Sequence, residues 1–164
     1  MSLATNAESL RGEQYRDASN LAARIALHAR FSTNALGWYR WVFERLPGLE
    51  QLHVLELGCG PGKLWTENAG RIPSGWSIRL SDASGGMVRE ARRSLARAGA
   101  HIEFVIAGAE ASPFRNGSFE CVVANHVLYH VSDRPAALRE IARVLAPDGV
   151  LVASTVGEAT ARFA

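Results

Sequence analysis

The 164-residue sequence has few cysteines, no long apolar run and little net charge. Its two thiols, Cys59 and Cys121, stand in separate apolar stretches, and no Cys or His pair has the spacing of a zinc site. We therefore predict reduced cysteines, no disulfide framework and no metal centre. No stretch approaches the roughly 20 apolar residues that span a bilayer, and the polar N-terminal segment lacks the apolar core of a secretory signal. These absences predict a cytoplasmic protein that does not enter a membrane.

The net charge of +2 is too small to favour a polyanionic partner such as nucleic acid. A local concentration of charge occurs in MVREARRSLARA, which holds Arg89, Arg92, Arg93 and Arg97. A basic binding surface and a solvated helix face both remain open, and charge runs of this kind are more often solvated. We therefore predict an exposed helix face and no nucleic-acid partner.

The composition, with 48% hydrophobic and 21% charged residues, is typical of a globular domain, and the length fits one such domain. Helical spacing of apolar residues predicts two N-terminal helices, LAARIALHARF after Asn20 and LGWYRWVFERL at residues 36–46. We expect residues 1–50 to form a helical segment that packs on a core formed by residues 51–164.

After Pro47 and Gly48 the pattern changes to short apolar strands separated by helical stretches. The expected strands are HVLEL, WSIRLS, IEFVI, ECVVAN and GVLVAS. The expected helices cover residues 63–71, 86–98 and 134–145, the last with Asp133 as its cap, Pro135 in its first turn and Pro147 beyond its end. Alternation of strands and helices requires crossover connections, so we predict a parallel sheet.

A glycine-rich loop, GCGPG at residues 58–62, follows the first strand and precedes a helix. That is where a parallel sheet forms its ligand crevice. Gly58, Gly60 and Gly62 permit positive φ and let a ligand lie against bare backbone. An ordinary tight turn is the alternative, but short strand-to-helix loops need far less glycine. The loop therefore predicts a ligand site.

The spacing of these glycines narrows the choice of ligand. A P-loop has four residues between its glycines and then Lys-Ser or Lys-Thr, whereas Gly58 and Gly62 enclose three and Lys63 precedes Leu64. A dinucleotide fingerprint that begins at Gly58 would require glycine where Lys63 stands. The spacing thus argues against nucleoside triphosphates and against dinucleotides.

The segment from Glu56 to Gly62 resembles motif I of the class I S-adenosylmethionine-dependent methyltransferases, an acidic residue followed after one position by G-x-G-x-G. The second strand ends in Asp82-Ala83-Ser84-Gly85-Gly86-Met87, which resembles the family's D-x-S-x-x-M run. In the family this acidic residue binds both ribose hydroxyls, and a carboxylate suits that task because it accepts two O–H bonds. Capping of the following helix is the alternative role for Asp82.

Two later segments extend the resemblance, so that it covers residues 52–155. AGAEASPFRNGSFECVVANHVLYHV is similar to the third and fourth family motifs, although Gly108 stands where an aspartate commonly holds the adenine amino group. Backbone of Ala109, the Glu110 side chain or water would then supply that contact, unless it is absent. RVLAPDGVLVAS resembles the family's R-V-L-K-P-G-G run, with Asp148 for glycine.

The resemblance implies S-adenosylmethionine as cofactor and methyl transfer to a small molecule. The cofactor-binding residues that it implies are Glu56, Gly58, Cys59, Gly60, Gly62, Asp82, Ala83, Met87, Gly108, Ala109, Glu110 and Asn125. Positioning supplies much of the rate of such a reaction, so a catalytic residue is optional. Where a proton must leave, the candidate bases are His126, Tyr129 and His130, which follow the fourth strand.

The N-terminal helices hold further candidates. Arg24, His28 and Phe31 share one helix face, and Tyr15 precedes it, although packing against the sheet explains these positions equally well. Trp38 and Trp41 fall on an apolar stripe, so we predict that they belong to the core rather than to a substrate cage.

The implied fold is an α/β Rossmann-like sandwich of three layers with strand order 3-2-1-4-5. Family members continue with two more strands, 7 and 6, which this sequence lacks after GVLVAS. We expect the fifth strand to be covered by a missing C-terminal segment or by a partner such as a second copy, unless the domain is a minimal one. A module that binds the cofactor but is inactive is therefore the alternative function. The methyl acceptor is not determined by these residues.

Overall fold

The computed structural model describes residue 30 and residues 35–155. The helices and strands of this part follow the alternation that the sequence predicts. In chain order they are α3 (Trp38–Phe43), β1 (Leu52–Leu57), α4 (Lys63–Thr66), the 3-10 turn η2 (Ala69–Arg71), β2 (Trp76–Asp82), α5 (Gly85–Ser94), β3 (His101–Ile106), β4 (Phe119–Asn125), α6 (Arg134–Val144) and β5 (Leu145–Ser154).

The five strands form one sheet in the order β3-β2-β1-β4-β5. Every adjacent pair is parallel. The predicted strand order is therefore confirmed. Because all strands run the same way, their carboxyl ends meet at one edge of the sheet, which is where such folds bind ligands. Within the described residues, β5 pairs with β4 alone.

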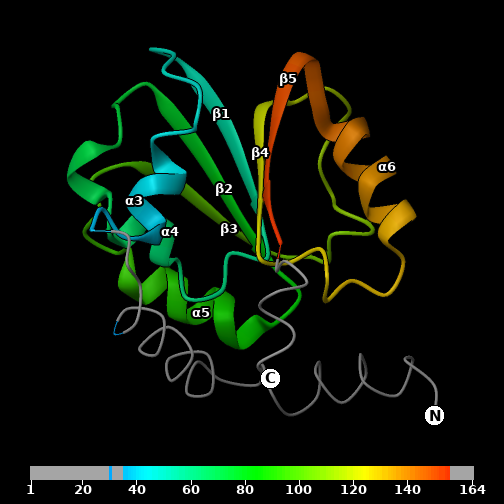
Figure 1. The fold of residues 1–164 in the computed structure, drawn as a ribbon, viewed down its shortest axis with the longest axis horizontal. Helices are drawn as coiled ribbons and strands as arrows, with labels where there is room; N and C mark the ends of the chain where they lie inside the picture. The colour runs from blue at the N-terminus through cyan, green and yellow to red at the C-terminus, as the bar shows by residue number, and fades with distance from the viewer. Residues whose placement is uncertain (1–29, 31–34, 156–164) are drawn as a thin grey trace.

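Helices cover both faces of the sheet and form three layers, with α3, α4 and α5 on one side and α6 on the other (Figure 1). Neighbouring residues of β1 enter different cores. Leu52 and Val54 pack with α3 and α4, whereas Leu55 and Leu57 pack with α6. A strand buried on both faces must be apolar at nearly every position, and this explains the run VLEL.

The predicted helix over residues 63–71 is broken in the structure. Helix α4 ends at Thr66, and only the short turn η2 follows. Asn68 is the reason, because its side-chain nitrogen donates to the Leu64 carbonyl at 2.7 Å and to the Tyr39 carbonyl at 3.2 Å. A side chain that takes the helix carbonyl competes with the backbone ladder. The buried asparagine thereby ties α4 to α3.

Other predicted boundaries shift by a few residues. The helix predicted over residues 36–46 is shorter, because Gly37 adopts φ +79° at its start and α3 ends at Phe43. Helix α6 has the predicted cap, since the Asp133 carboxylate accepts from the Ala136 N–H at 2.9 Å, but it ends at Val144. Leu145 instead begins β5 and pairs with Phe119. Of the first predicted helix, only Arg30 is described, in helical conformation.

Candidate active site

The glycine loop connects β1 to α4 at the carboxyl edge of the sheet. Gly58, Gly60 and Gly62 adopt φ values of +67°, +53° and +77°, a region that side chains disfavour. The Cys59 N–H donates to the Ser81 carbonyl at 2.9 Å, so the loop is tied to the end of β2. The predicted positive-φ glycines are therefore present, and they bring the loop beside Asp82.

At two of these glycines, a side chain would also collide with neighbouring residues. A Cβ atom on Gly58 would collide with the Val127 side chain, and one on Gly62 would lie 2.9 Å from Leu95 Cδ1. The first contact shows that the loop after β4 lies directly on the glycine loop. The second shows that α5 packs closely against the start of α4.

Asp82 ends β2 and holds the surrounding backbone with both carboxylate oxygens. Oδ2 accepts from the Gly60 N–H at 2.9 Å, and Oδ1 accepts from the Ser84 N–H at 2.8 Å. Burial raises the pKa of this carboxyl, while the two N–H groups lower it. Capping of α5 falls to Ser84, whose Oγ accepts from the Met87 N–H at 3.3 Å. The alternative role of Asp82 as the helix cap is therefore wrong.

Glu56 lies beneath the glycine loop rather than at its surface. Its side chain is buried, and Oε2 accepts from Trp65 Nε1 at 2.6 Å. Burial raises the pKa of Glu56 from 4.5 to about 8, and the charge of Asp82 adds to that rise, while the Trp65 hydrogen bond lowers the pKa. Glu56 thus supports the loop through α4.

Three other predicted residues, Cys59, Ala83 and Met87, lie in contrasting environments. Ala83 is exposed, whereas Met87 is 1% exposed and belongs to the core. Cys59 is also buried, with its Sγ 3.5 Å from the Gly60 carbonyl oxygen. Exposure places Ala83 among the residues that a ligand can reach, whereas the side chains of Met87 and Cys59 stabilise the loop and helix from within.

Glu110 fills part of the space that Gly108 leaves. Its Oε2 lies 3.1 Å from the position of a Cβ on Gly108, and its Oε1 accepts from Ser132 Oγ at 3.2 Å. Gly108 forms an isolated antiparallel bridge with Ala111, which folds the segment back on itself. A carboxylate is thus present beside Gly108, although it comes from a position two residues later.

A cluster on α6 fixes the segment that follows Glu110. Glu140 Oε1 accepts from the Ser112 N–H at 2.8 Å and from Ser112 Oγ at 2.6 Å. Arg143 donates to Glu140 Oε1 at 2.6 Å and to the Phe114 carbonyl at 2.8 Å. Hydrogen bonds from Arg143 and Ser112 hold the pKa of Glu140 at about 2. The turn that carries Gly108 and Glu110 is therefore anchored to α6.

The end of β4 brings the aromatic candidates together. His126 stacks on Trp38 with ring centroids 5.0 Å apart and meets Tyr129 edge-on at 6.3 Å. The rings of Tyr129 and His130 lie 4.2 Å apart. His126 adopts φ +55°, which is rare for a residue with a side chain. The three predicted proton acceptors thus occupy one loop, which contacts the glycine loop through Val127.

The prediction that Trp38 belongs to the core is wrong. Its side chain is 37% exposed, and Nε1 donates to Asn125 Oδ1 at 3.1 Å. Trp41 is partly buried and packs on the core as predicted, while its ring stacks on Trp38 at 5.3 Å. Sequence reasoning also missed Ser154, which bonds to Asn125 at 2.7 Å. Its position at the end of the strand beside β4 was the signal available for finding it.

Tyr15, Arg24, His28 and Phe31 lie outside the described residues, so the structure does not place them. The described residues contain no group of three or more His, Cys, Asp or Glu side chains that could hold a metal ion. The described helices also include none with the length and apolar character needed to cross a membrane.

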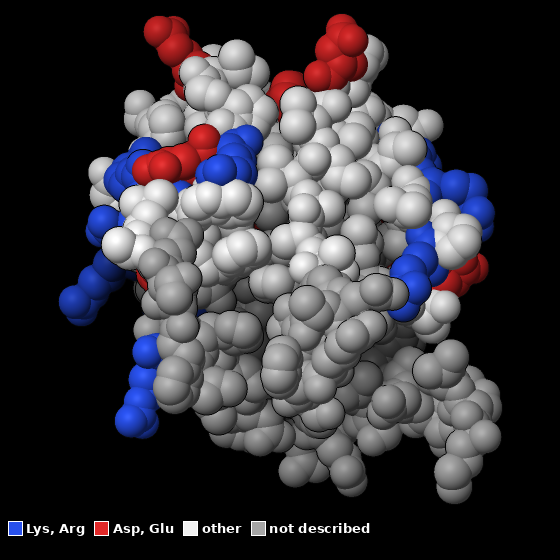
Figure 2. Space-filling model, in the orientation of Figure 1, with Lys and Arg blue, Asp and Glu red and all other residues white. Residues whose placement is uncertain are grey.

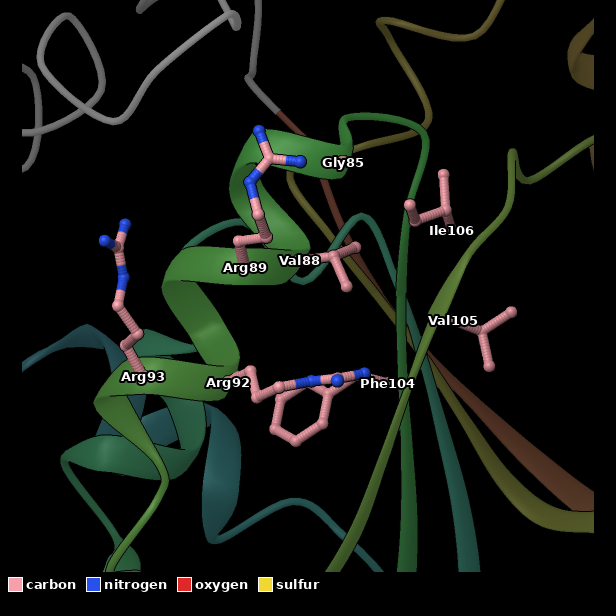
Figure 3. A pocket seen from close by; sticks show the side chains of 8 residues that line it. All are labelled: Gly85, Val88, Arg89, Arg92, Arg93, Phe104, Val105 and Ile106. Atoms are coloured by element: carbon pink, nitrogen blue, oxygen red, sulfur yellow. The ribbon is translucent and has the colours of Figure 1, made fainter.

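The arginines of α5 border a separate hollow of about 690 Å³ beside the edge strand β3 (Figure 3). Its lining includes Val88, Arg92 and Phe104, and the Arg92 guanidinium lies over the Phe104 ring at 5.5 Å. The glycine loop and Asp82 do not contribute to it. The predicted exposure of the basic helix face is confirmed, since Arg89, Arg92, Arg93 and Arg97 are all exposed. On the face shown in Figure 2, charged side chains of both signs lie toward the top and the two sides of the described surface.

A family model described as a methyltransferase domain matches residues 55–153. This chain belongs to that methyltransferase family. The matched range contains the glycine loop, Asp82, the whole of β4 and all of β5 but its last residue, so the resemblance to class I methyltransferases is confirmed. Helix α3, which precedes the matched range, shares a core with β1 and β2.

Relatives that the chain resembles bear the names of different methyltransferases. The chain is 38% identical over 119 residues to the ubiquinone/menaquinone biosynthesis C-methyltransferase UbiE of Hahella chejuensis, covering 70% of this chain and 47% of that protein. It is 34% identical over 113 residues to the malonyl-[acyl-carrier protein] O-methyltransferase of Geobacter sulfurreducens, covering 69% of this chain and 42% of that protein. The chain thus spans less than half the length of either relative.

Solved structures agree with the fold. The [4+2]-cyclase SpnF matches with a TM-score of 0.64 at 27% identity, over 71% of this chain and 43% of that one. A SAM-dependent methyltransferase from Methanosarcina mazei matches with a TM-score of 0.59 at 28% identity, over 71% of this chain and 57% of that one. The architecture is therefore the Rossmann-like one that the family resemblance implies.

Proposed function

We propose that this chain binds S-adenosylmethionine at the carboxyl edge of its sheet and transfers the methyl group to a small molecule. The observation that carries the proposal is the Asp82 carboxylate, which joins the glycine loop to α5 through the N–H groups of Gly60 and Ser84. Each oxygen accepts one of these bonds and keeps a second lone pair. Two neighbouring ribose hydroxyls would donate to those lone pairs.

Other residues at this edge suit the remaining parts of the cofactor. The backbone at Gly58 and Gly60 carries no side chain that would block the methionine portion. Glu110 offers a carboxylate beside Gly108, and a carboxylate accepts from an amino group such as that of adenine. We therefore assign to Glu110 the contact that the family commonly makes from the position of Gly108. Ala83 is exposed and would contact the adenine ring.

The cofactor, when bound, supplies a methyl group that its sulfonium makes electrophilic. The work of the chain is to position the two reactants, for which effective molarities correspond to about 7–11 kcal/mol of barrier. The loop of His126, Tyr129 and His130 contacts the glycine loop through Val127. Where the methyl acceptor must lose a proton, these three side chains are the candidate bases. A small organic methyl acceptor agrees with the names of the relatives. One name refers to ubiquinone and menaquinone biosynthesis, and the other to a malonyl group on an acyl-carrier protein.

Calorimetric titration with S-adenosylhomocysteine tests the proposal. Wild-type protein should bind it, and Asp82→Ala should weaken the affinity by roughly 10- to 100-fold, the equivalent of a charged hydrogen bond. Asp82→Asn should be nearly as harmful, because both carboxylate oxygens accept from backbone N–H groups and an amide nitrogen cannot accept. Asp148→Asn is the matched control, since Asp148 is exposed in the irregular first part of β5 and adopts φ +61°, which asparagine tolerates. Absence of binding by folded wild-type protein would reject the cofactor assignment.

A second candidate is a module that binds the cofactor without transferring its methyl group. The chain spans less than half of the two relatives, and a chain of the same fold bears the name of a cyclase. This candidate predicts binding of S-adenosylhomocysteine with no release of labelled methyl from S-adenosylmethionine to any acceptor. Methyl transfer to one acceptor, abolished by Asp82→Ala, would eliminate it.

A further inference from the structure

The side chain of Asn125, at the end of β4, has a fixed orientation. Its Oδ1 lies 3.1 Å from Trp38 Nε1 and 2.7 Å from Ser154 Oγ. An indole N–H donates and never accepts, so the Asn125 atom that faces Trp38 must be the oxygen. The choice between the oxygen and nitrogen of this amide therefore follows from chemistry.

Ser154 agrees with this orientation. Its Oγ accepts from the backbone N–H of His126 at 2.9 Å, and a backbone N–H also only donates. The hydroxyl hydrogen of Ser154 is thus available for Asn125 Oδ1. Trp38 of α3 therefore requires the carbonyl oxygen of Asn125, and Ser154 of β5 donates to the same oxygen.

The amide nitrogen of Asn125 consequently remains as a donor. A carbonyl oxygen has two lone pairs, and Trp38 and Ser154 occupy both. Across the part of the chain that the structure describes, the Asn125 Nδ2 group makes no hydrogen bond. Asn125 therefore presents two N–H donors and no remaining acceptor.

The position of Asn125 places these donors beside the glycine loop. Glu56 of β1 pairs with Val123 of β4, so Gly58 and Asn125 each lie two residues beyond that pair. The next turn of chain touches the loop, because Val127 blocks the space of a Cβ on Gly58. Asn125 shares its strand face with Val123, which packs on the α3 side of the sheet.

Stacked rings hold this arrangement in place. Trp38 stacks on both Trp41 and His126 at 5.3 and 5.0 Å, and the Arg45 guanidinium lies 3.3 Å over the Trp41 ring. Rotation of the Asn125 amide would break both hydrogen bonds and bring its N–H group against the Trp38 N–H, which cannot accept. Asn125 is thereby preorganised as a donor.

We propose that Asn125 selects the methyl acceptor by donating its N–H group to an acceptor oxygen, a phenolate, enolate or carboxylate, and that Trp38 and Ser154 are the positioning residues that fix this polarity. The inference rests on the proposed function, because it requires methyl transfer at the glycine loop. Amines that arrive protonated present only N–H donors, which meet no lone pair on Asn125, and are disfavoured.

The test compares Asn125→Asp with wild-type protein. Aspartate keeps the oxygen that faces Trp38 and Ser154 but replaces the N–H donors with a negative oxygen. Transfer of labelled methyl is measured to catechol, 4-hydroxybenzoate and acetylacetone as oxygen-bearing acceptors, and to benzylamine and histamine as amines. We expect wild-type protein to favour the first group, and Asn125→Asp to lower kcat/KM for that group by roughly 10- to 100-fold, the loss of one charge-assisted hydrogen bond.

Further variants separate the effect of the Asn125 amide orientation from any effect on folding. Trp38→Phe combined with Ser154→Ala removes both donors and keeps a ring in the stack, so the amide can rotate and the preference for oxygen over amine acceptors should fall at least tenfold. Asn116→Asp is the matched control, because Asn116 is exposed and uses its Oδ1 to accept from Arg143. Asn125→Ala serves in place of Asn125→Asp if thermal melting shows that the aspartate variant does not fold.

The results of these experiments separate a failure of the acceptor preference from a failure of cofactor binding. The inference is overturned if wild-type protein prefers amines, if Asn125→Asp leaves transfer to oxygen-bearing acceptors unchanged, or if protein that binds S-adenosylhomocysteine methylates none of those acceptors. Failure of wild-type protein to bind S-adenosylhomocysteine would instead contradict the proposed function.

Discussion

Glu56 carries a carboxyl group into the apolar layer between β1 and α4, and this makes stability depend on pH. Its pKa is about 8 in the folded chain against an ordinary 4.5, so the folded chain keeps a proton that the unfolded chain loses. The stabilising contribution is complete below pH 4.5 and is lost progressively as the pH rises toward 8. Each unit of pKa difference corresponds to about 1.4 kcal/mol.

The variant Glu56→Gln should remove this dependence. Glutamine can still accept from Trp65 but does not titrate, so its free energy of unfolding relative to wild type should increase by several kcal/mol between pH 5 and pH 8. Urea unfolding at four pH values measures the difference. Exposed Glu50 provides the control, as Glu50→Gln. Parallel stability profiles for wild type and Glu56→Gln would show that Glu56 has no raised pKa.

Individual residues differ in how well the sequence could place them. Asp82 and the three glycines stand in short motifs whose residues interact with near neighbours, and the structure brings them together as expected. Trp38 could not be placed in this way. Helical spacing groups it with partly buried Trp41 and buried Val42 on one stripe, but its indole donates to Asn125, 87 residues later in the chain. Periodicity indicates which face of a helix packs and leaves the polar partner of a ring undetermined.

At the scale of elements, the contact between the glycine loop and the loop after β4 has a measurable energy. Gly58→Ala introduces a Cβ at φ +67° and against Val127. We expect a loss of about 1–2 kcal/mol from the backbone alone, a further steric loss, and weaker binding of S-adenosylhomocysteine.

A double-mutant cycle separates the two contributions. Val127→Ala should relieve the steric part in the Gly58→Ala background and leave the backbone part, which gives a coupling of about 0.5–3 kcal/mol in urea unfolding. Gly70→Ala is the control, because a Cβ on Gly70 meets no atom within 4 Å and its φ is not positive. Strict additivity of the Gly58 and Val127 variants would mean that the two loops do not touch.

Elements were predicted well where the pattern is local. The five strands and the cap of α6 follow from apolar runs and from Asp133 and Pro135. The break after α4 did not, because Asn68 acts through a carbonyl of α3 as well as through its own helix. The start of β5 at Leu145 likewise depends on pairing with Phe119 of another strand. Boundaries that are set by tertiary partners are not encoded in the local sequence.

At the scale of the whole molecule, β1 and β4 join the two cores, since each strand contributes side chains to both faces of the sheet. This predicts one cooperative unfolding transition. Tryptophan fluorescence reports the α3 side, because Trp38 lies in α3 and the other three tryptophans, Trp41, Trp65 and Trp76, pack in the core beneath it. Far-ultraviolet circular dichroism also reports α6.

Thermal unfolding followed by both signals tests this prediction. The two curves should coincide, and S-adenosylhomocysteine at 100 times its dissociation constant should shift both equally, by an amount that corresponds to about 2.7 kcal/mol. Asp82→Ala protein without ligand provides the reference unfolding temperature of a folded chain whose binding site is weakened. A dichroism transition that persists after the fluorescence transition would show that the α6 layer unfolds separately.

The reactivity of the two cysteines, finally, reports how often buried parts of the molecule open to solvent. Both thiols are buried, Cys59 in the glycine loop and Cys121 in β4. Burial raises the pKa of Cys59 well above its ordinary value and that of Cys121 to about 12. Alkylating reagents attack the thiolate, so the native chain resists labelling and the unfolded chain offers two sulfurs. Faster alkylation of Cys59 than of Cys121 would therefore time the fluctuations of the loop separately from those of the sheet.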